Sequence, residues 1–189
     1  MRTVALLAMA CAFVPAILLI VDVALPRIAS ASVQFFVDAT EPGHRISPYI
    51  YGTNFHTLGP QENIESQRYG GNRLTGYNWE TNASNAGADW YHSSDGYLSS
   101  SVEPAKALMD FHEKSLEMGA SYTIVTLQAA GYVAADRQGP VSEAETAPSK
   151  RWKEVKSRKG EPFSLKPSRF DDYVYMDELV NFLVTKYGD

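Results

Sequence analysis

Aromatic rings and amide or carboxylate side chains are mixed through residues 68–97, a pattern suited to holding a sugar. Rings can cover the apolar C–H face of a pyranose, while polar groups fix its hydroxyls. The segment lacks both the helical period and the alternation of a strand. The alternative is a Gly- and Asn-rich surface loop with incidental aromatics. The residues concerned are Tyr69, Tyr77, Trp79, Trp90, Tyr91 and Tyr97 among Asn72, Asn78, Asn82, Asn85, Asp89, His92 and Asp95.

The acids of this segment are candidates for catalysis, because glycoside hydrolysis uses two carboxylates about 5–9.5 Å apart. Glu80 is the acid most embedded among the aromatics, with Asp89 and Asp95 near it in the chain. A parallel barrel places catalytic groups at the carboxyl ends of its strands, and none of the three has such a place. We therefore favour a structural role for them, through backbone hydrogen bonds or a bound cation.

Several catalytic classes are excluded by residue content. Cys11 is the single cysteine, which excludes a disulfide framework, a zinc knuckle and a thiol nucleophile. No two histidines have metal-ligand spacing, and the serine-nucleophile motif G-x-S-x-G does not occur. His56 closely follows a predicted strand, where it could contact a substrate or be a structural histidine.

The charge distribution argues against a nucleic-acid partner. The net charge is −5, so no global basic field favours a polyanion. Residues 150–169 nevertheless hold eight of the seventeen basic residues, together with Trp152. A solvated loop is the favoured interpretation of this run, and contact with an anionic polysaccharide is the alternative.

Residues 1–31 have the features of a secretory signal peptide. Arg2 precedes a nearly continuous apolar run over residues 4–21, and residues 29–31 (ASA) offer a small-x-small cleavage site. The alternative is an uncleaved anchor, since about 20 apolar residues span a bilayer. We predict a secreted protein that contacts a membrane only if this segment is not cleaved.

Strands and helices alternate along the chain, which predicts an α/β fold with a parallel sheet. Helix 103–118 is expected to begin with Pro104 at its first position and to bury one face made by Leu108, Phe111, Ser115 and Met118. The second helix should begin at Asp171 or Asp172. Strands are expected at 33–39, 49–54, 66–69 and 122–127, a second helix ending at 186, and long loops at about 70–102 and 134–170.

Several separated motifs, in order, resemble glycoside hydrolase family 44. That resemblance implies a (β/α)₈ barrel joined to a β-sandwich. It also implies a secreted endo-β-1,4-glucanase that often acts on xyloglucan and retains configuration. The motifs are ISPYIYGTN (46–54), GGNRLTGYNWE (70–80), SNAGADW (84–90), HSSD (92–95), VTLQAAGYV (125–133) and YMDELVNFL (175–183).

The resemblance also implies a domain plan. Residues 32–45 would be the first strand of the sandwich. Residues 46–189 would be a partial barrel of about three βα units that stops before the fourth strand. The family's acid/base glutamate lies in an Asn-Glu-Pro motif, which does not occur here. Both catalytic glutamates are therefore expected beyond Asp189, and none within this chain.

The matching motifs further imply site residues. Glu80, with Asp171 or Asp172, would hold a structural calcium ion, and catalysis would need no cofactor. The partner would be a β-1,4-glucan, and the complete protein would be a monomer. The alternative is a non-catalytic, secreted carbohydrate-binding module with Trp79 and Trp90 as platforms. The residues that would line or shape the substrate cleft are Asn54, Arg73, Asn78, Trp79 and Trp90.

Overall fold

The computed structural model describes residues 32–40, 43–55 and 64–188. The chain divides into two units, residues 1–43 and 44–189, and each is described by itself. The predicted signal segment and His56 lie outside the described residues. Among the described helices, none has the length and apolar character needed to cross a membrane.

The strand predicted over residues 33–39 does not form in the first unit. Residues 32–38 have neither helix nor strand, and Phe35 and Phe36 are fully open to solvent. A strand depends on ladder hydrogen bonds to a neighbour, and no described strand pairs with this segment. The strand predicted from composition is not present among these residues, because β propensity reflects packing against partner strands.

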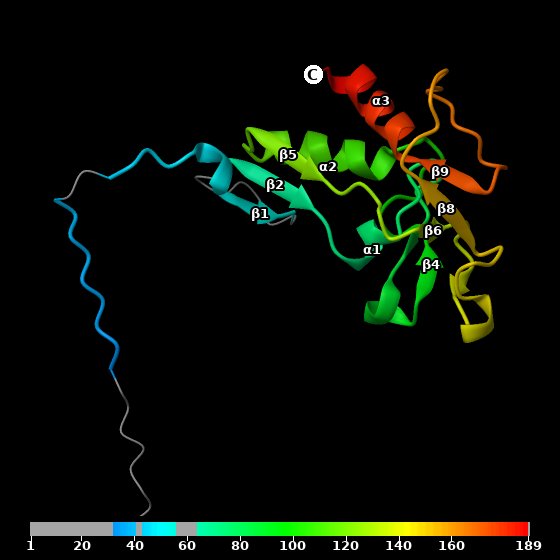
Figure 1. The fold of residues 1–189 in the computed structure, drawn as a ribbon, viewed down its shortest axis with the longest axis horizontal. Coiled ribbons are helices and arrows are strands. Elements are labelled where there is room, and N and C mark those ends of the chain that lie inside the picture. The colour runs from blue at the N-terminus through cyan, green and yellow to red at the C-terminus, as the bar shows by residue number, and fades with distance from the viewer. Residues whose placement is uncertain (1–31, 41–42, 56–63, 189) are drawn as a thin grey trace, which may run out of the picture. The chain divides into compact units, whose positions relative to one another are not determined.

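A parallel sheet of three strands begins the second unit, in the order β1-β2-β5 (Figure 1). Its strands are β1 (Gly52–Asn54), β2 (Ser66–Tyr69) and β5 (Tyr122–Val125). The strand predicted at 66–69 is confirmed. The strand predicted at 122–127 is confirmed only as far as Val125. The strand predicted at 49–54 forms only over Gly52–Asn54. The 3-10 helix η1 (Pro48–Ile50) occupies its expected beginning. Gly52 is required where it stands, because a Cβ there would lie 2.0 Å from Ser66 Oγ.

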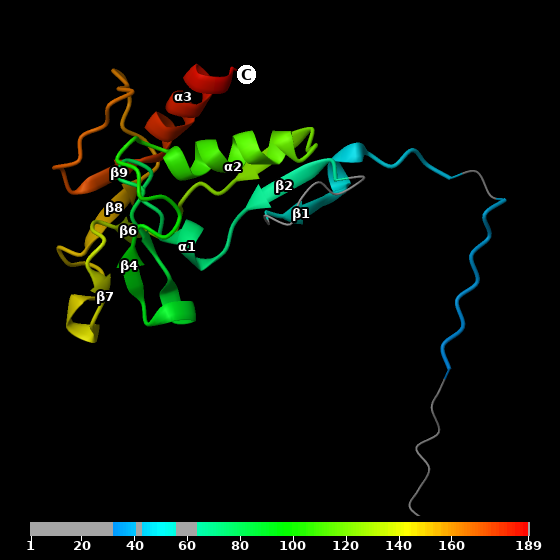
Figure 2. The same ribbon diagram turned by 180° about the vertical axis from the view of Figure 1, so that it is seen from behind.

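Helix α2 (Lys106–Glu117) packs on one face of this sheet (Figures 1 and 2). Ser115 Oγ donates to Gln67 Oε1 at 2.8 Å, and the Phe111 ring stacks on Tyr69 with centroids 4.8 Å apart. The predicted buried face is confirmed for Leu108, Phe111 and Ser115, which are all buried. The fourth predicted member, Met118, is only partly buried and follows the last residue of the helix.

The beginning of α2 differs from the prediction. The helix starts at Lys106, not at Pro104. The buried Asn82 caps it from outside, because its Oδ1 accepts hydrogen bonds from Ala107 N at 3.1 Å and Tyr77 OH at 2.7 Å. Unpaired N–H groups at a helix start need such acceptors. A residue distant in sequence therefore sets where this helix begins.

The two long predicted loops are instead built around small sheets. One has the order β3-β4-β7 and the other β6-β8-β9. These strands are two to five residues long and several pair with distant partners, so local periodicity does not reveal them. The elements are α1 (Asn72–Thr75), β3 (Ser84–Asn85), η2 (Gly87–Trp90), β4 (Ser93–Asp95), β6 (Tyr132–Ala134), β7 (Gly139–Pro140), η3 (Glu143–Glu145), β8 (Trp152–Lys156) and β9 (Tyr173–Tyr175).

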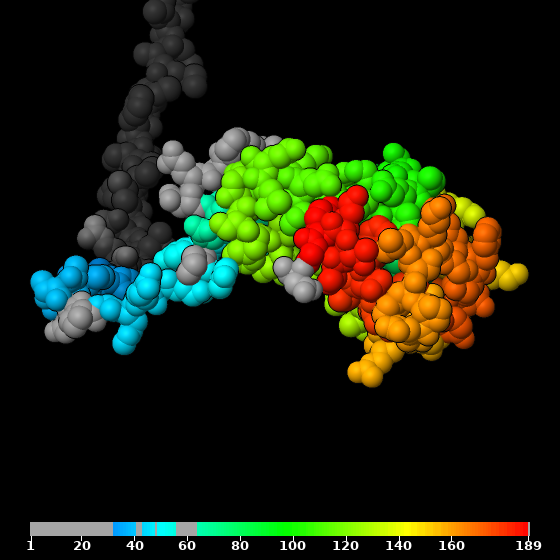
Figure 3. Space-filling model, turned by 90° about the horizontal axis from the view of Figure 1, so that it is seen from above, coloured from blue at the N-terminus to red at the C-terminus, as the bar shows by residue number. Residues whose placement is uncertain are grey.

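Helix α3 (Met176–Tyr187) starts later than the predicted Asp171 or Asp172, because β9 occupies the preceding residues. Its first turn anchors the loop 157–172. Asp177 accepts hydrogen bonds from Lys159 N at 2.9 Å and Gly160 N at 3.1 Å. Buried Glu178 accepts one from Ser164 N at 2.8 Å. Figure 3 shows this loop, in orange, directly beside α3, in red.

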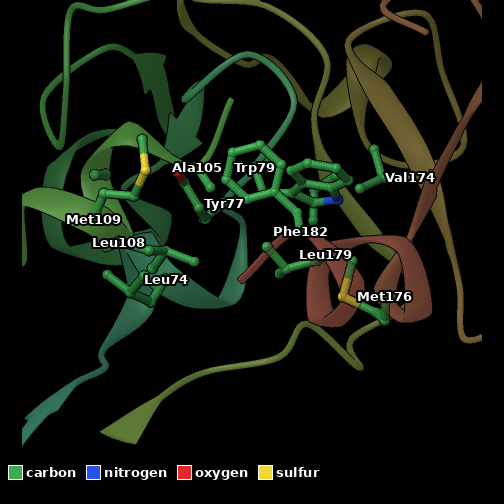
Figure 4. Packing of buried hydrophobic residues seen from close by; sticks show 12 residues of the cluster. Leu74, Tyr77, Trp79, Ala105, Leu108, Met109, Val174, Met176, Leu179 and Phe182 are labelled. Carbon is green, nitrogen blue, oxygen red and sulfur yellow. The ribbon is translucent and has the colours of Figure 1, made fainter. Parts of the chain in front are cut away.

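One apolar core joins these parts (Figure 4). Trp79 lies against Phe182 of α3 with ring centroids 5.7 Å apart, and Tyr77 and Trp79 have no exposed surface. The segment predicted to be an open loop therefore supplies the largest core side chains. The cluster comprises Leu74, Tyr77, Trp79, Ala105, Ala107, Leu108, Met109, Val133, Val174, Met176, Leu179 and Phe182.

Candidate functional site

A hollow of about 430 Å³ lies among the segments that follow the carboxyl ends of β2 and β5. Thr126 Oγ1 donates to Tyr69 O at 2.9 Å, and Gln128 Nε2 donates to Leu74 O at 2.9 Å. These bonds hold the two segments together. Carboxyl ends of parallel strands are where α/β proteins place their sites. The lining is Asn72, Thr75, Gly76, Asn85, Gly87, Ala88, His92, Ala130, Tyr132, Ala147 and Trp152.

One wall is the turn that runs from β3 through η2 to β4, and Asn85 fixes its shape. Asn85 Nδ2 donates to His92 O at 2.7 Å and to Ser94 Oγ at 3.0 Å, while its Oδ1 accepts from Gly87 N at 2.8 Å. Because both N–H groups and one acceptor site of this amide are used inside the protein, Asn85 mainly fixes the shape of the hollow.

The other wall carries the rings of Tyr132 and Trp152, from β6 and β8. Trp152 Nε1 donates to Glu145 O at 2.9 Å. Beside it, Arg151 Nε donates to Asp136 Oδ2 at 2.7 Å and its Nη1 lies 3.2 Å from Glu145 Oε1. These bonds fix the indole before any ligand arrives, which lowers the entropic cost of binding.

The chemistry of the hollow is that of binding. Flat rings beside the amide of Asn72 and the imidazole of His92 can cover a sugar ring and hold its hydroxyls. Its described lining contains no Asp or Glu. Bond cleavage by a pair of carboxylates therefore needs acids from outside this set.

Two predicted cleft residues, Trp90 and Arg73, lie at the surface or beside it. Trp90 is exposed in η2, next to the hollow-lining Gly87 and Ala88. Arg73 forms a two-pronged ion pair with Asp95, with Nη2 3.1 Å from Oδ2. The Arg73 guanidinium also lies over the ring of Tyr97, with its Cζ 4.3 Å from the ring centroid.

Asn54 belongs to a different surface. Its Oδ1 accepts a hydrogen bond from Arg68 Nε at 3.1 Å, within a separate depression over the face of the parallel sheet that includes Ile124. It does not line the hollow, and neither do the other four predicted cleft residues, so the structure does not bring the predicted set together there.

Asn78 and Trp79 require a correction, because both are completely buried. Asn78 Nδ2 donates to Ala134 O at 3.0 Å, and Trp79 Nε1 donates to Tyr175 O at 3.2 Å. Figure 4 shows the Trp79 ring inside the core. Neither side chain can touch a polysaccharide, so their role is structural, within the core and its hydrogen bonds.

The predicted calcium ligands do not fit a calcium ion. Lys153 Nζ lies 2.8 Å from Glu80 Oε2 and 3.2 Å from Asp171 Oδ1, so an ammonium group already stands between the carboxylates. Calcium needs six to eight oxygen ligands at about 2.3–2.6 Å, and the described residues contain no group of three or more candidate ligands. Burial raises the pKa of Glu80 to about 7, and the bond from Lys153 opposes that rise.

Half of the basic residues in the run 150–169 are paired with acids. Arg151, Lys153, Lys156 and Lys159 form ion pairs, and the partner of Lys159 is the buried Glu178. The other four (Lys150, Arg158, Lys166 and Arg169) form no ion pair among the described residues, so contact with an anionic polysaccharide stays a prediction.

The rings that line the hollow belong to Tyr132 and Trp152. From the sequence, Trp152 was interpreted only as part of the basic run, and Tyr132 was given no site role. The sequence signal for Trp152 is its place between Arg151 and Lys153, whose acidic partners lie in other segments.

Similarity to known proteins decides the family. The sequence profile of glycoside hydrolase family 44 matches residues 83–189, more than half of the chain. The chain belongs to glycoside hydrolase family 44. The resemblance predicted from the sequence motifs is thereby confirmed.

Relatives in family 44 extend over most of this chain. Endoglucanase A of Paenibacillus lautus is 53% identical over 169 residues, covering 85% of this chain and 24% of that protein. Beta-mannanase/endoglucanase A of Caldicellulosiruptor saccharolyticus is 53% identical, covering 82% of this chain and 12% of that protein. The chain thus spans a quarter or less of these relatives.

Solved family 44 structures share the fold. The endoglucanase Cel44A of Clostridium thermocellum has a TM-score of 0.71 at 56% identity, covering 76% of this chain and 29% of its own. A Paenibacillus polymyxa xyloglucanase determined with xyloglucan has a TM-score of 0.70 at 54% identity, with the same coverage. The predicted α/β class is confirmed at this level.

Proposed function

We propose that this protein takes part in the hydrolysis of β-1,4-glucosidic linkages in cellulose-type glucans or xyloglucan, with retention of configuration. The observation that carries the proposal is the hollow with the rings of Tyr132 and Trp152, placed after the carboxyl ends of β2 and β5. Family 44 relatives named as endoglucanases and xyloglucanases support this substrate class.

In this proposal the sheet β1-β2-β5 is the beginning of a (β/α)₈ barrel, and residues 32–45 contribute to a β-sandwich. Retaining hydrolysis uses two carboxylates about 5–5.5 Å apart. The described hollow supplies neither, so both belong to other parts of the catalytic domain. This chain then provides the wall that binds and orients the glucan. Export through residues 1–31 is part of the same proposal.

The binding-module alternative has less support. Trp79 is buried and cannot serve as a platform, so only Trp90 remains of the two proposed rings. The hollow is also concave, with a volume within the range of about 300–1,000 Å³ usual for ligand pockets.

A domain exchange tests the proposal. Residues 44–189 would replace the matching segment of the Paenibacillus polymyxa xyloglucanase, to which they are 54% identical. We expect the chimera to release reducing sugar from xyloglucan, with the retained anomer seen by NMR at early times. The 189-residue chain alone should release none. A folded chimera without hydrolysis, or hydrolysis by the chain alone, would contradict the proposal.

A further inference from the structure

A second groove, of about 650 Å³, adjoins the hollow. Tyr132 and Trp152 line both. The two depressions are therefore neighbours that share these rings. The remaining lining of the groove is Ala135, Pro148, Ser149, Lys150, Lys153, Glu154, Arg169, Asp171, Asp172 and Tyr173.

The floor of the groove is the outer face of sheet β6-β8-β9. Val133, Lys153 and Val174 point to the interior, since all three are buried. Successive residues of a strand face opposite sides, so their neighbours point outward. The register pairs Tyr132 with Glu154 and Glu154 with Tyr173. A ring, a carboxylate and a second ring thus form a row across three strands, and the backbones that carry the two rings are about 10 Å apart at two strand spacings.

The lining of the groove has no net charge, because its three cations (Lys150, Lys153 and Arg169) match its three anions (Glu154, Asp171 and Asp172) in number. Lys153 is paired with Glu80 and Asp171, and Glu154 is paired with Lys156 at 2.6 Å. The Lys156 ammonium also lies 5.1 Å from the centroid of the Tyr173 ring. A groove without net charge that carries two aromatic rings suits a neutral ligand rich in hydroxyls.

We propose that this groove is a further sugar-binding region, so that one glucan chain runs from the hollow across Trp152 to Tyr173. The inference rests on the proposed function and extends its binding site. Trp152 is the common ring. Tyr173 would contact only chains long enough to leave the hollow.

Isothermal titration of the 189-residue chain with cellotriose and cellohexaose tests this. We expect cellohexaose to bind more tightly than cellotriose. Tyr173→Ala should weaken cellohexaose binding roughly five- to tenfold, the value of an aromatic contact, and leave cellotriose binding unchanged. Tyr173→Leu, which keeps apolar volume without a flat ring, should behave likewise. The control is Phe170→Ala, because Phe170 is fully exposed and lines no part of the groove.

The outcomes separate the two proposals. The groove proposal is contradicted if both sugars bind the unchanged chain equally, or if folded Tyr173 variants bind cellohexaose as tightly as the unchanged chain. The proposal that the hollow binds glucan is not affected by either result. A Tyr173 variant that weakens both sugars equally also overturns it, because the ring would then act within the hollow. If neither sugar binds the unchanged chain, both proposals fall.

Discussion

Lys153 and Glu80 form an ion pair in the protein interior, with Nζ 2.8 Å from Oε2 and both side chains almost fully buried. The pair joins the turn that holds Trp79 to the middle strand of sheet β6-β8-β9. Together with the hydrogen bond from Asn78 Nδ2 to Ala134 O, this ion pair ties the turn before β3 to the sheet that carries Tyr132 and Trp152.

Breaking the pair on one side should be costly. Lys153→Met leaves the Glu80 carboxylate buried without a partner, and we expect a loss of about 3–5 kcal/mol in the free energy of unfolding. Urea denaturation measures it. The control Lys156→Met breaks an exposed pair with Glu154 and should cost less than about 1 kcal/mol. Equal effects of the two variants would refute a structural role for the buried pair.

The buried Glu80 should make stability depend on pH. Its pKa is raised from 4.5 to about 7 in the folded protein, chiefly by burial, so the folded state holds this proton more tightly than the unfolded state. Its contribution to stability is complete below the unfolded pKa and is lost as pH rises from about 4.5 to 7. Urea denaturation across this pH range measures the effect, and Glu80→Gln should remove the decline in the free energy of unfolding. The exposed Glu117→Gln is the control and should keep the decline. The same decline in Glu80→Gln as in the unchanged chain would contradict a titrating Glu80.

Truncation of the two tryptophans of the aromatic segment should affect stability to very different extents. Trp79→Ala empties a core position and should cost about 3–5 kcal/mol in unfolding free energy. Trp90→Ala removes an exposed ring and should change it by less than about 0.5 kcal/mol. Thermal and urea denaturation of both variants check this. Similar losses for both would contradict the placement of Trp79 in the core.

The loop 157–172 should depend on Asp177. Asp177→Ala removes the carboxylate that accepts hydrogen bonds from Lys159 N and Gly160 N, which are stronger than neutral ones. We expect trypsin to cut after Arg158 or Lys159 several times faster, as shown by mass spectrometry of early fragments. Glu161→Gln, in the same exposed loop, should leave the rate unchanged. An unaltered rate in Asp177→Ala would mean that other contacts hold the loop.

The local sequence pattern was sufficient to predict the elements in which composition and hydrophobic period agree. Strands 66–69 and 122–127 and the buried face of α2 could be predicted because composition and period coincide there. The small sheets could not, since β4 pairs with the distant β7. Helix α2 likewise starts where Asn82, 25 residues before Ala107, provides a cap.

The site was harder to predict for the same reason. Trp79 and Trp90 lie in one aromatic segment, and nothing in their immediate sequence separates a core ring from an exposed one. Their difference comes from Tyr175 O, the bond partner of Trp79, which lies 96 residues further along the chain. The role of Trp152 was hidden because the partners that neutralise its charged neighbours, such as Asp136 and Glu80, lie in other segments.

The most direct test of the account is the affinity of the hollow for a short β-1,4-glucan. Isothermal titration with cellotriose would compare the unchanged chain with Trp152→Ala, with Phe170→Ala as the exposed-ring control and near-ultraviolet circular dichroism to verify folding. We predict binding that Trp152→Ala weakens about tenfold or more and that Phe170→Ala leaves unchanged. Undiminished binding by a folded Trp152→Ala variant would contradict the central claim that this hollow holds the glucan.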